Sequence, residues 1–254
     1  MENQVKKAEK PKFQIPTEQV DIPSKGKLYP SDHPLASGKV EMKYMTAKEE
    51  DILTNQNYIE KGVVIDKLLQ SLIVSDFNYN DLLIGDKNAI MVAARILSYG
   101  KDYDIQYNGK DITVDLTEIK DKELDFDSLE QGQREFTFGL PKSGNEVTFK
   151  LLTHGDDKNI DREVEGLKKI NRESSATLST RMKYIITSVN GDREVSTIRQ
   201  FVDQGLLAQD ARALREEYAR VQPDVEFKVY HVDEDGVGED IDVPVTINFF
   251  WPDA

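Results

Sequence analysis

Two stretches of this chain share one pattern and decide its expected fold. Val40–Thr46 reads VEMKYMT, and Val147–Thr153 reads VTFKLLT. Apolar residues occupy the same alternate positions in both stretches, which is the pattern of a β-strand with one buried face. A Lys and a Thr also coincide, at the fourth and the seventh position. The first stretch should run into a helix, because Thr46 and Glu49 have the spacing of a capping box, in which each side chain accepts a hydrogen bond from a backbone N–H at the helix start.

A second match follows later in each half of the chain. Leu82–Asp86 reads LLIGD and Leu206–Asp210 reads LLAQD, a shift of 206 − 82 = 124 residues, against 147 − 40 = 107 for the first match. Longer connections in the second half account for the difference. In both places the Asp lies where a helix N-terminus favours an acceptor and a negative charge. Two ordered matches favour an internal duplication. The alternative is that a strand, a Thr cap and an acid-capped helix recur by chance in an α+β protein.

The elements expected around these matches follow a similar order in both halves. The first half should contain a strand at 39–45, a helix from Thr46, helices at 63–74 and 86–99, and a hairpin of 103–107 and 112–116 around the turn-forming pair Asn108-Gly109. The second half should contain strands at 135–140 and 146–152, helices at 156–170, 178–189 and 210–221, and strands at 225–232 and 241–249.

The sequence therefore predicts an α+β fold of two tandem similar modules, each a strand, about three helices and a β-hairpin. The predicted domains are an N-terminal tail and Pro-rich arm (1–37), a first module (38–116), an acidic linker (117–133) and a second module (134–254).

Charge and composition narrow the function classes. The chain has 254 residues, a formal net charge of −14 and no cysteine. An acidic protein lacks the excess of Lys and Arg that sequence-independent nucleic-acid binding requires. No run approaches the ~18 apolar residues of a membrane-spanning helix, and the Lys-rich residues 1–12 lack the apolar core of a secretory signal. We therefore expect no nucleic-acid partner, no membrane partner, and synthesis in a cytoplasm.

The sequence contains no recognisable catalytic or metal-binding pattern. The histidines, His33, His154 and His231, are far apart along the chain, and thiolate ligands are absent. Phosphate-binding, dinucleotide-binding and nucleophile-elbow motifs do not occur. We expect a protein that is not an enzyme and that binds no cofactor and no metal. A metal-independent hydrolase built from scattered carboxylates is the alternative from a different class.

Candidate protein-binding residues lie at both ends of the chain. They are Ile22, Pro23, Leu28 and Tyr29 in the arm, and Phe250 and Trp251 near the C-terminus. The arm is rich in prolines, which lack a backbone N–H, so we expect it to pair poorly with the chain's own sheet. Large aromatic side chains often form the centre of protein interfaces. The alternative is that both segments pack on the chain's own modules and only stabilise them.

Several short motifs together resemble one family of proteins. They are the stretch 20–26 (VDIPSKG), Thr46 with Glu50 and Ile52, the stretch 85–87 (GDK), the stretch 95–100 (RILSYG) with Tyr103, and the stretch 249–252 (FFWP). This set resembles the baseplate hub subunits and hub-assembly proteins of T-even-type contractile-tailed bacteriophages, over about residues 20–107 and 181–252.

The resemblance implies a virus-encoded protein that joins or helps to assemble the baseplate hub of the tail, without catalysis. The implied partners are other baseplate hub proteins, with the tape-measure protein and further copies of the chain as additional candidates. The implied location is the host cytoplasm during assembly and then the virion tail baseplate. The choice between a permanent hub component and a transient assembly factor stays open, and the runner-up is a structural component elsewhere in the tail, such as the wedge or the tube end.

Members of this group often carry Cys pairs in their hairpins, which suit a zinc site. Because this chain has no cysteine, the resemblance implies hairpins held by turn chemistry and packing alone.

Overall fold

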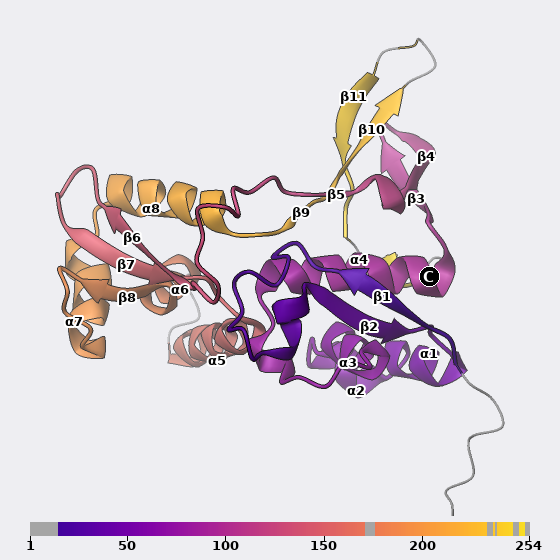
Figure 1. Ribbon diagram of the computed structural model, residues 1–254, viewed down its shortest axis with the longest axis horizontal. Coiled ribbons are helices and arrows are strands. Elements are labelled where there is room, and N and C mark those ends of the chain that lie inside the picture. Colours follow the sequence, from indigo (N-terminus) through magenta and orange to yellow (C-terminus); the bar gives the residue numbers. More distant parts are fainter. Residues whose placement is uncertain (1–14, 171–175, 233–235, 237, 246–248, 252–254) are drawn as a thin grey trace, which may run out of the picture.

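The computed structural model describes residues 15–170, 176–232, 236, 238–245 and 249–251. It has a mixed α+β fold, as the sequence predicts, in which helices pack on small antiparallel sheets. Figure 1 shows two lobes side by side along the long axis, with β-hairpins that project from one end.

The α-helices are Ala47–Leu53 (α1), Gln56–Glu60 (α2), Val64–Leu72 (α3), Ile84–Tyr99 (α4), His154–Ile170 (α5), Thr177–Ile185 (α6), Val195–Gln200 (α7) and Ala208–Val221 (α8). Shorter helical turns are Pro34–Ser37 (η1), Tyr79–Asp81 (η2), Leu116–Glu118 (η3) and Phe201–Gly205 (η4). The strands are Thr17–Asp21 (β1), Lys39–Lys43 (β2), Asp102–Tyr107 (β3), Lys110–Asp115 (β4), Lys120–Asp121 (β5), Glu135–Gly139 (β6), Glu146–Lys150 (β7), Ile186–Val189 (β8), Val225–Glu226 (β9), Lys228–Val232 (β10) and Gly238–Asp242 (β11).

The first lobe is built on the antiparallel pair β1–β2. Val40 and Met42 on β2 are fully buried, because alternate residues of a strand point to the same face. Helix α4 contacts both strands and α3. After α3 the chain returns to the sheet, where Ile73 forms an antiparallel bridge with Met42.

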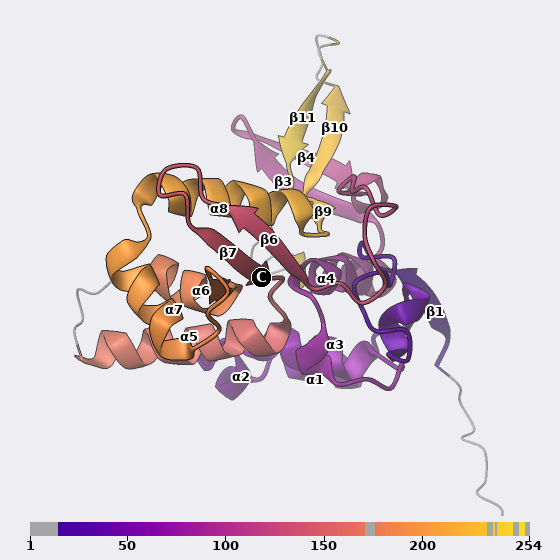
Figure 2. The same cartoon turned by 60° about the vertical axis from the view of Figure 1, so that its left-hand side comes forward.

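The second lobe is built on the antiparallel sheet β6-β7-β8. Figure 2 shows α8 along one side of this sheet and α5, α6 and α7 along the other. The expected helix at 178–189 is wrong over its last four residues, since α6 ends at Ile185 and Ile186–Val189 form β8. The sequence ITSV is rich in β-branched residues, which pack well on a pleated sheet, and it pairs with the edge of β7.

Other boundaries also differ from the expected ones. The expected strand at 225–232 is interrupted at Phe227, which separates β9 from β10. The expected strand at 241–249 is confirmed only at 241–242 and is wrong at 243–245: β11 ends at Asp242, and Pro244 beyond it cannot donate to a ladder. Part of that expected strand, 246–248, lies outside the described residues. Helices α2 and α7 have no counterpart in the sequence-based expectation.

The two projecting hairpins lie next to each other although they are far apart in the sequence (Figure 1). β3–β4 turns at Asn108 and Gly109, which both have positive φ, so the predicted hairpin is confirmed. Its Tyr107 hydroxyl donates to Glu239 of β11.

The segment 117–133 is packed against the rest of the chain. β5 pairs with β9, and the Gly132 N–H donates to the Lys27 carbonyl at 2.8 Å. Buried apolar side chains of both lobes form one continuous cluster. At the junction the backbone is so close that a Cβ on Gly85 would lie 1.8 Å from the carbonyl oxygen of Pro223.

Candidate functional site

The N-terminal arm belongs to the protein's own sheet. β1 pairs with β2 along its whole length, so the expectation that the arm pairs poorly is wrong. The pairing is possible because the prolines lie outside the strand: Pro16 precedes β1, and Pro23 follows it.

Most of the candidate protein-binding residues are buried in the chain itself. The buried ones are Ile22, Pro23, Leu28, Tyr29 and Phe250, whereas Trp251 is half-buried against the core. Burial gives these side chains a role in folding, which is the alternative to a role in binding a partner. The protein-binding role of the two ends therefore stays a prediction, and its accessible part is Trp251.

Tyr29 anchors the arm to the start of α4. Its hydroxyl donates to Asp86 Oδ2 at 2.7 Å and accepts from the Leu83 backbone N–H at 2.9 Å. Asp86 Oδ1 accepts from the Ser24 N–H at 2.9 Å. Burial raises the pKa of Asp86 to about 6, although these hydrogen bonds act in the opposite direction. Burial and the neighbouring Asp86 carboxylate raise the pKa of Tyr29 well above its ordinary value.

These contacts correct the expected role of Asp86. Helix α4 begins at Ile84, so Asp86 is its third residue. Its carboxylate accepts from the arm, through Ser24 and Tyr29, rather than from the N–H groups of its own helix. The residue therefore joins two distant segments instead of only starting a helix.

Asp210 makes a corresponding contact in the second lobe. It is the third residue of α8, and its carboxylate accepts from the Lys142 N–H at 2.7 Å and the Ser143 N–H at 3.0 Å. Burial raises the pKa of Asp210, but the hydrogen bonds from Lys142 and Ser143 outweigh burial, so the pKa is lowered. Asp86 and Asp210 thus each hold a turn, but the pKa of Asp86 is raised and the pKa of Asp210 is lowered.

The turns that these aspartates hold are alike. The stretch 23–26 (PSKG) follows β1 within the arm, and the stretch 141–144 (PKSG) joins β6 to β7. Gly26 and Gly144 both have a φ of +73°, a conformation that favours glycine. Both turns contain Pro, Ser, Lys and Gly. This similarity is a sequence signal for the two contacts, and it lies outside the strand and helix matches.

The predicted capping box of α1 is confirmed. Glu49 Oε2 accepts from the Thr46 N–H at 3.1 Å, and Glu49 Oε1 pairs with Lys43 Nζ at 2.7 Å. Burial raises the pKa of Glu49, but hydrogen bonds from Lys43, Thr46 and Ser71 outweigh it and lower the pKa to about 2.

The second lobe repeats this arrangement at the start of α5. Asp156 Oδ2 accepts from the Thr153 N–H at 3.1 Å, and Asp156 Oδ1 pairs with Lys150 Nζ at 2.7 Å. A strand Lys, a Thr and an acid three residues later therefore form the same local unit in both lobes, with Asp in place of Glu.

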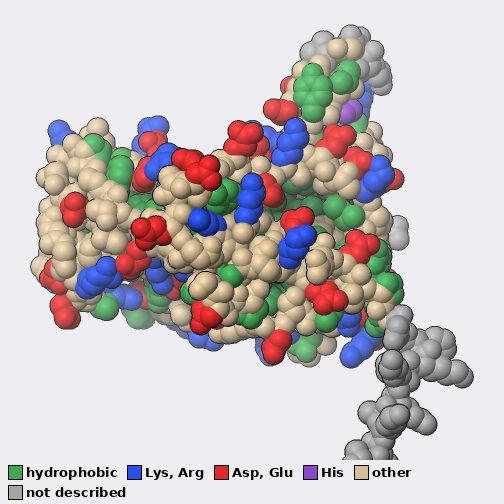
Figure 3. Space-filling model, in the orientation of Figure 1, with side chains coloured by type: hydrophobic (Ala, Val, Ile, Leu, Met, Phe, Trp, Pro, Cys, Tyr) green, Lys and Arg blue, Asp and Glu red, His purple; other side chains and the backbone are tan. Residues whose placement is uncertain are grey.

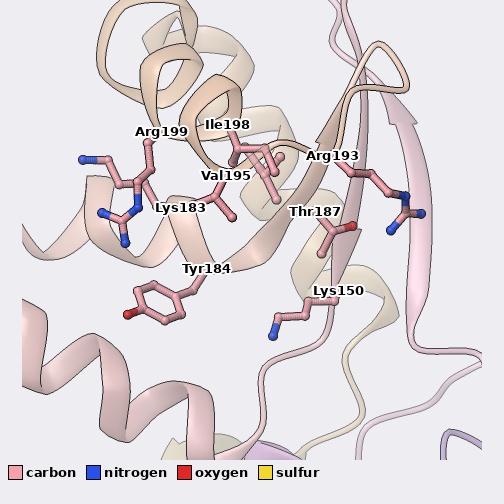
Figure 4. A pocket seen from close by; sticks show the side chains of 9 residues that line it. Lys150, Lys183, Tyr184, Thr187, Arg193, Val195, Ile198 and Arg199 are labelled. Atoms are coloured by element: carbon pink, nitrogen blue, oxygen red, sulfur yellow. The ribbon is translucent and has the colours of Figure 1, made fainter.

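A cavity of about 340 Å³ lies between α6, β8 and α7 (Figure 4). Apolar side chains line it together with four cations, Lys150, Lys183, Arg193 and Arg199. Each cation is paired with a carboxylate, at N–O distances of 2.7, 2.7, 2.9 and 2.7 Å, from Asp156, Asp203, Glu135 and Glu163 respectively. The charges of the lining are therefore neutralised within the chain, and the cavity suits an apolar side chain better than an anion.

The two lobes meet at a polar network in which His154 is buried and Asp66, Tyr79 and Lys87 are partly exposed. Asp66 of α3 pairs with Lys87 Nζ at 2.6 Å and accepts from the Tyr79 hydroxyl at 3.2 Å. His154 Nε2 lies 3.7 Å from the Asp66 carboxylate, and its ring packs edge-on against Tyr79. Burial lowers the pKa of His154, which favours the neutral imidazole. The side chains of Asp66, Tyr79, Lys87 and His154 thus form one connected network, which joins α3, α4 and α5.

The projecting hairpin β10–β11 carries exposed apolar side chains. Tyr230 is 63% exposed and Val232 is 53% exposed. Figure 3 shows hydrophobic atoms gathered on this hairpin, whereas acidic and basic side chains are interspersed over the body below it.

Within the described ranges, no three or more His, Cys, Asp or Glu side chains are grouped so that they could hold a metal ion. The histidines lie in separate places: His33 stacks on Tyr29, His154 lies at the lobe junction, and His231 lies in β10 next to Tyr107. In the part of the chain that the structure describes, no helix is long and apolar enough to cross a membrane.

These observations define a two-lobed α+β protein whose lobes are held by corresponding turns, helix caps and buried aspartates. The chain belongs to the family described as T4 bacteriophage base plate protein, whose family model matches residues 15–250. It is thus a T4-type phage baseplate protein, which confirms the coarser part of the resemblance seen in the sequence. No curated protein and no solved structure matches the chain.

Proposed function

We propose that this chain is a non-enzymatic protein that binds other baseplate hub proteins and acts in assembly of the hub of a contractile phage tail. The observation that carries the proposal is the family match over residues 15–250, which covers both lobes. The hub is favoured within the baseplate because the motifs at 20–26, 85–87, 95–100 and 249–252 resemble hub subunits and hub-assembly proteins.

Contacts in the structure connect these motifs to one another around α4. The turn in 20–26 is held by Asp86 of the second motif through the Ser24 N–H. In the third motif, Arg95 donates to the Gly100 carbonyl at 2.9 Å and so fixes the end of α4. In the fourth, Phe249 packs edge-on against Tyr103, which follows α4. Residues that are dispersed in the sequence therefore support one helix and its surroundings.

A binding role is also consistent with the chemistry of the cavity and of the lobe junction. The cations in the cavity are paired with carboxylates, and Asp66, Lys87 and His154 bind one another between the lobes. Groups held in this way stabilise the fold. Other hub proteins are the proposed partners, with the tape-measure protein and further copies of this chain as additional candidates, and the proposed location is the virion tail, reached by assembly in the host cytoplasm.

We also propose that the two lobes arose by duplication. The support is that two independent contacts recur in chain order: the Lys-Thr-acid unit after β2 and β7, and the Asp at the third position of α4 and α8 that holds a turn. If the helix caps recurred by chance, nothing would make the third residue of both helices also accept from the backbone of a similar turn.

The alternative function is a structural component elsewhere in the tail, in the wedge or at the tube end. An infection in which the gene carries an early stop codon separates the two. The proposal predicts that wedges assemble and that complete hubs are missing, with rescue by the wild-type protein supplied from a plasmid. Complete hubs together with defective wedges or defective tube ends would contradict it.

A further inference from the structure

The junction between the lobes contains a backbone bridge whose two sides both have a counterpart elsewhere in the chain. Residues 82–84 pair with residues 152–154 as an antiparallel bridge centred on Leu83 and Thr153. Backbone hydrogen bonds of 2.8 and 3.3 Å flank the bridge. The bridge buries Leu83, which is 2% exposed.

The counterpart of Leu83 in the second lobe is Leu207, at the shift of 207 − 83 = 124 residues that also relates Asp86 to Asp210. The backbone shape is the same: Leu83 has φ −63° and ψ 146°, and Leu207 has φ −66° and ψ 148°. Leu207, however, is 46% exposed. Within the described residues, the Leu206 carbonyl has no backbone hydrogen bond.

The counterpart of Thr153 in the first lobe is Thr46, at the shift of 153 − 46 = 107 residues. Both Thr residues precede a helix and make the same contact to an acid three residues later. Thr46 and its neighbour Met45 are half-exposed. Over the described ranges, the Met45 carbonyl makes no backbone hydrogen bond. The second lobe thus repeats the Leu83 side of the bridge at Leu207, and the first lobe repeats the Thr153 side at Thr46. Neither repeat forms a bridge within the described residues.

These two free sides cannot meet within one chain. Figure 1 places the start of α8 at the same end of the long axis as α7, and the end of β2 with α1 towards the opposite end. Complementary sides at opposite ends of one chain are the geometry of a head-to-tail contact between copies, in which each copy offers a different surface to the next.

We propose that the segment around Leu207 of one copy of this chain docks on the segment around Thr46 of a second copy, by repeating the bridge between Leu83 and Thr153. The Leu206 carbonyl would accept from the Ala47 N–H, and the Ala208 N–H would donate to the Met45 carbonyl. The inference rests on the proposed duplication and not on a place in the hub, so it stands or falls separately from the hub assignment.

The partner that docks on either segment is a second copy of this chain, because one chain carries both sides of a contact like the bridge between Leu83 and Thr153. Association would remove the exposed Leu207 side chain from water, as the internal bridge does for Leu83, and the loss of apolar surface to water favours association. One position departs from the internal pattern. Gly155 packs against Asn80, where a Cβ would lie 3.1 Å from the Asn80 side chain, and the corresponding residue of the first lobe is Lys48. The intermolecular contact therefore opens slightly at this point, where the exposed Lys48 can turn towards solvent.

Cysteine cross-linking tests the register, because the wild-type chain has no cysteine. Residues opposite each other in an antiparallel pair have Cα atoms about 4.5–5.5 Å apart, within the range that a disulfide spans. Thr46→Cys with Leu207→Cys in the full-length chain should form dimers and higher multimers under mild oxidation. A mixture of the two single variants should form dimers and nothing larger.

The matched control is Thr46→Cys with Val195→Cys, because Val195 is at the same end and is more exposed, at 65%. Leu83→Cys with Thr153→Cys is the positive control, and it should close within one chain. Each variant is first shown to unfold cooperatively, as the parent chain does.

Light scattering without cross-linking gives a second measurement on the cysteine-free chain. The mass should rise with concentration, and Leu207→Lys should abolish the rise whereas Val195→Lys should not. A wild-type chain that stays monomeric over the whole soluble range would overturn the proposal. So would equal cross-linking through Val195, closed dimers from Leu207→Cys alone, or cross-linking only to a different baseplate protein.

Discussion

The hydroxyl of Tyr29 and the carboxylate of Asp86 are joined by a buried hydrogen bond of 2.7 Å, although 57 positions separate them in the chain. This contact connects the N-terminal arm to the helix that runs through the first lobe. It makes the arm part of the folded unit, and it explains why motifs at 20–26 and 85–87 occur together.

Removing the carboxylate of Asp86 should destabilise the protein strongly. Asp86→Ala leaves the Ser24 N–H and the Tyr29 hydroxyl buried without their acceptor, which should cost roughly 2–6 kcal/mol in the free energy of unfolding, at about 1–3 kcal/mol for each of the two unpaired groups. Asp210→Ala should lower the melting temperature in the same direction. Denaturant unfolding measures both, with the exposed Asp76→Ala as the control. Stability equal to that of the control would show that the arm is not held in this way.

The same residue predicts a pH dependence. Burial raises the pKa of Asp86 to about 6 from 3.8, so the folded state binds its proton more tightly than the unfolded state does. Stability from this group is then fully present below pH 3.8 and falls as the pH rises to about 6, by on the order of 3 kcal/mol at 1.36 kcal/mol per pKa unit. Asp86→Asn removes this titration. Relative to Asp86→Asn, the wild type should therefore lose stability between pH 4 and pH 6, and a constant difference across that interval would contradict the raised pKa.

Two glycines in helices should respond oppositely to alanine. A Cβ on Gly85 would lie 1.8 Å from the Pro223 carbonyl oxygen, so Gly85→Ala must separate α4 from the segment before β9 and should cost about 1–3 kcal/mol or more. At Gly166 of α5 a Cβ meets no atom within 4 Å, so Gly166→Ala should stabilise the protein by about 0.5–1 kcal/mol. Thermal unfolding of the pair checks both signs, and a shift in the same direction for both would refute the close approach at Gly85.

The aromatic residues at the C-terminal end should separate into a folding role and a binding role. Phe250 is 2% exposed, so Phe250→Ala should cost about 3–5 kcal/mol of stability. Trp251 is only half-buried, so Trp251→Ala should cost less stability than Phe250→Ala and should stay folded. If Trp251 belongs to the partner-binding surface, this variant loses co-purification with hub proteins while it stays folded. Full retention of binding by a folded Trp251→Ala protein would leave Trp251 with a packing role alone.

The sequence predicts the features of this fold that local physics determines. Alternation marks β2 and β7, the spacing of Thr46 and Glu49 marks a helix start, and Asn108-Gly109 marks a hairpin, because each pattern acts within a few residues. The family resemblance rests on residues that prove to be in contact, such as Ser24 and Asp86.

Features that depend on distant partners are not predictable in the same way. Residues 186–189 continue a helical pattern, yet they become a strand because the edge of β7 is free to pair with them. The arm looks unable to join a sheet until the positions of Pro16 and Pro23 relative to β1 are known. The burial of Phe250 likewise depends on a core that includes residues from the whole chain.

Quantitative mass spectrometry of purified tails and of separated hub and wedge assembly intermediates tests whether this chain acts in the hub. The chain should be enriched in hub intermediates together with other hub proteins. Its copy number in finished tails then decides between a permanent component and a transient factor. Enrichment in wedge intermediates, with none in hub intermediates, would contradict the proposed function.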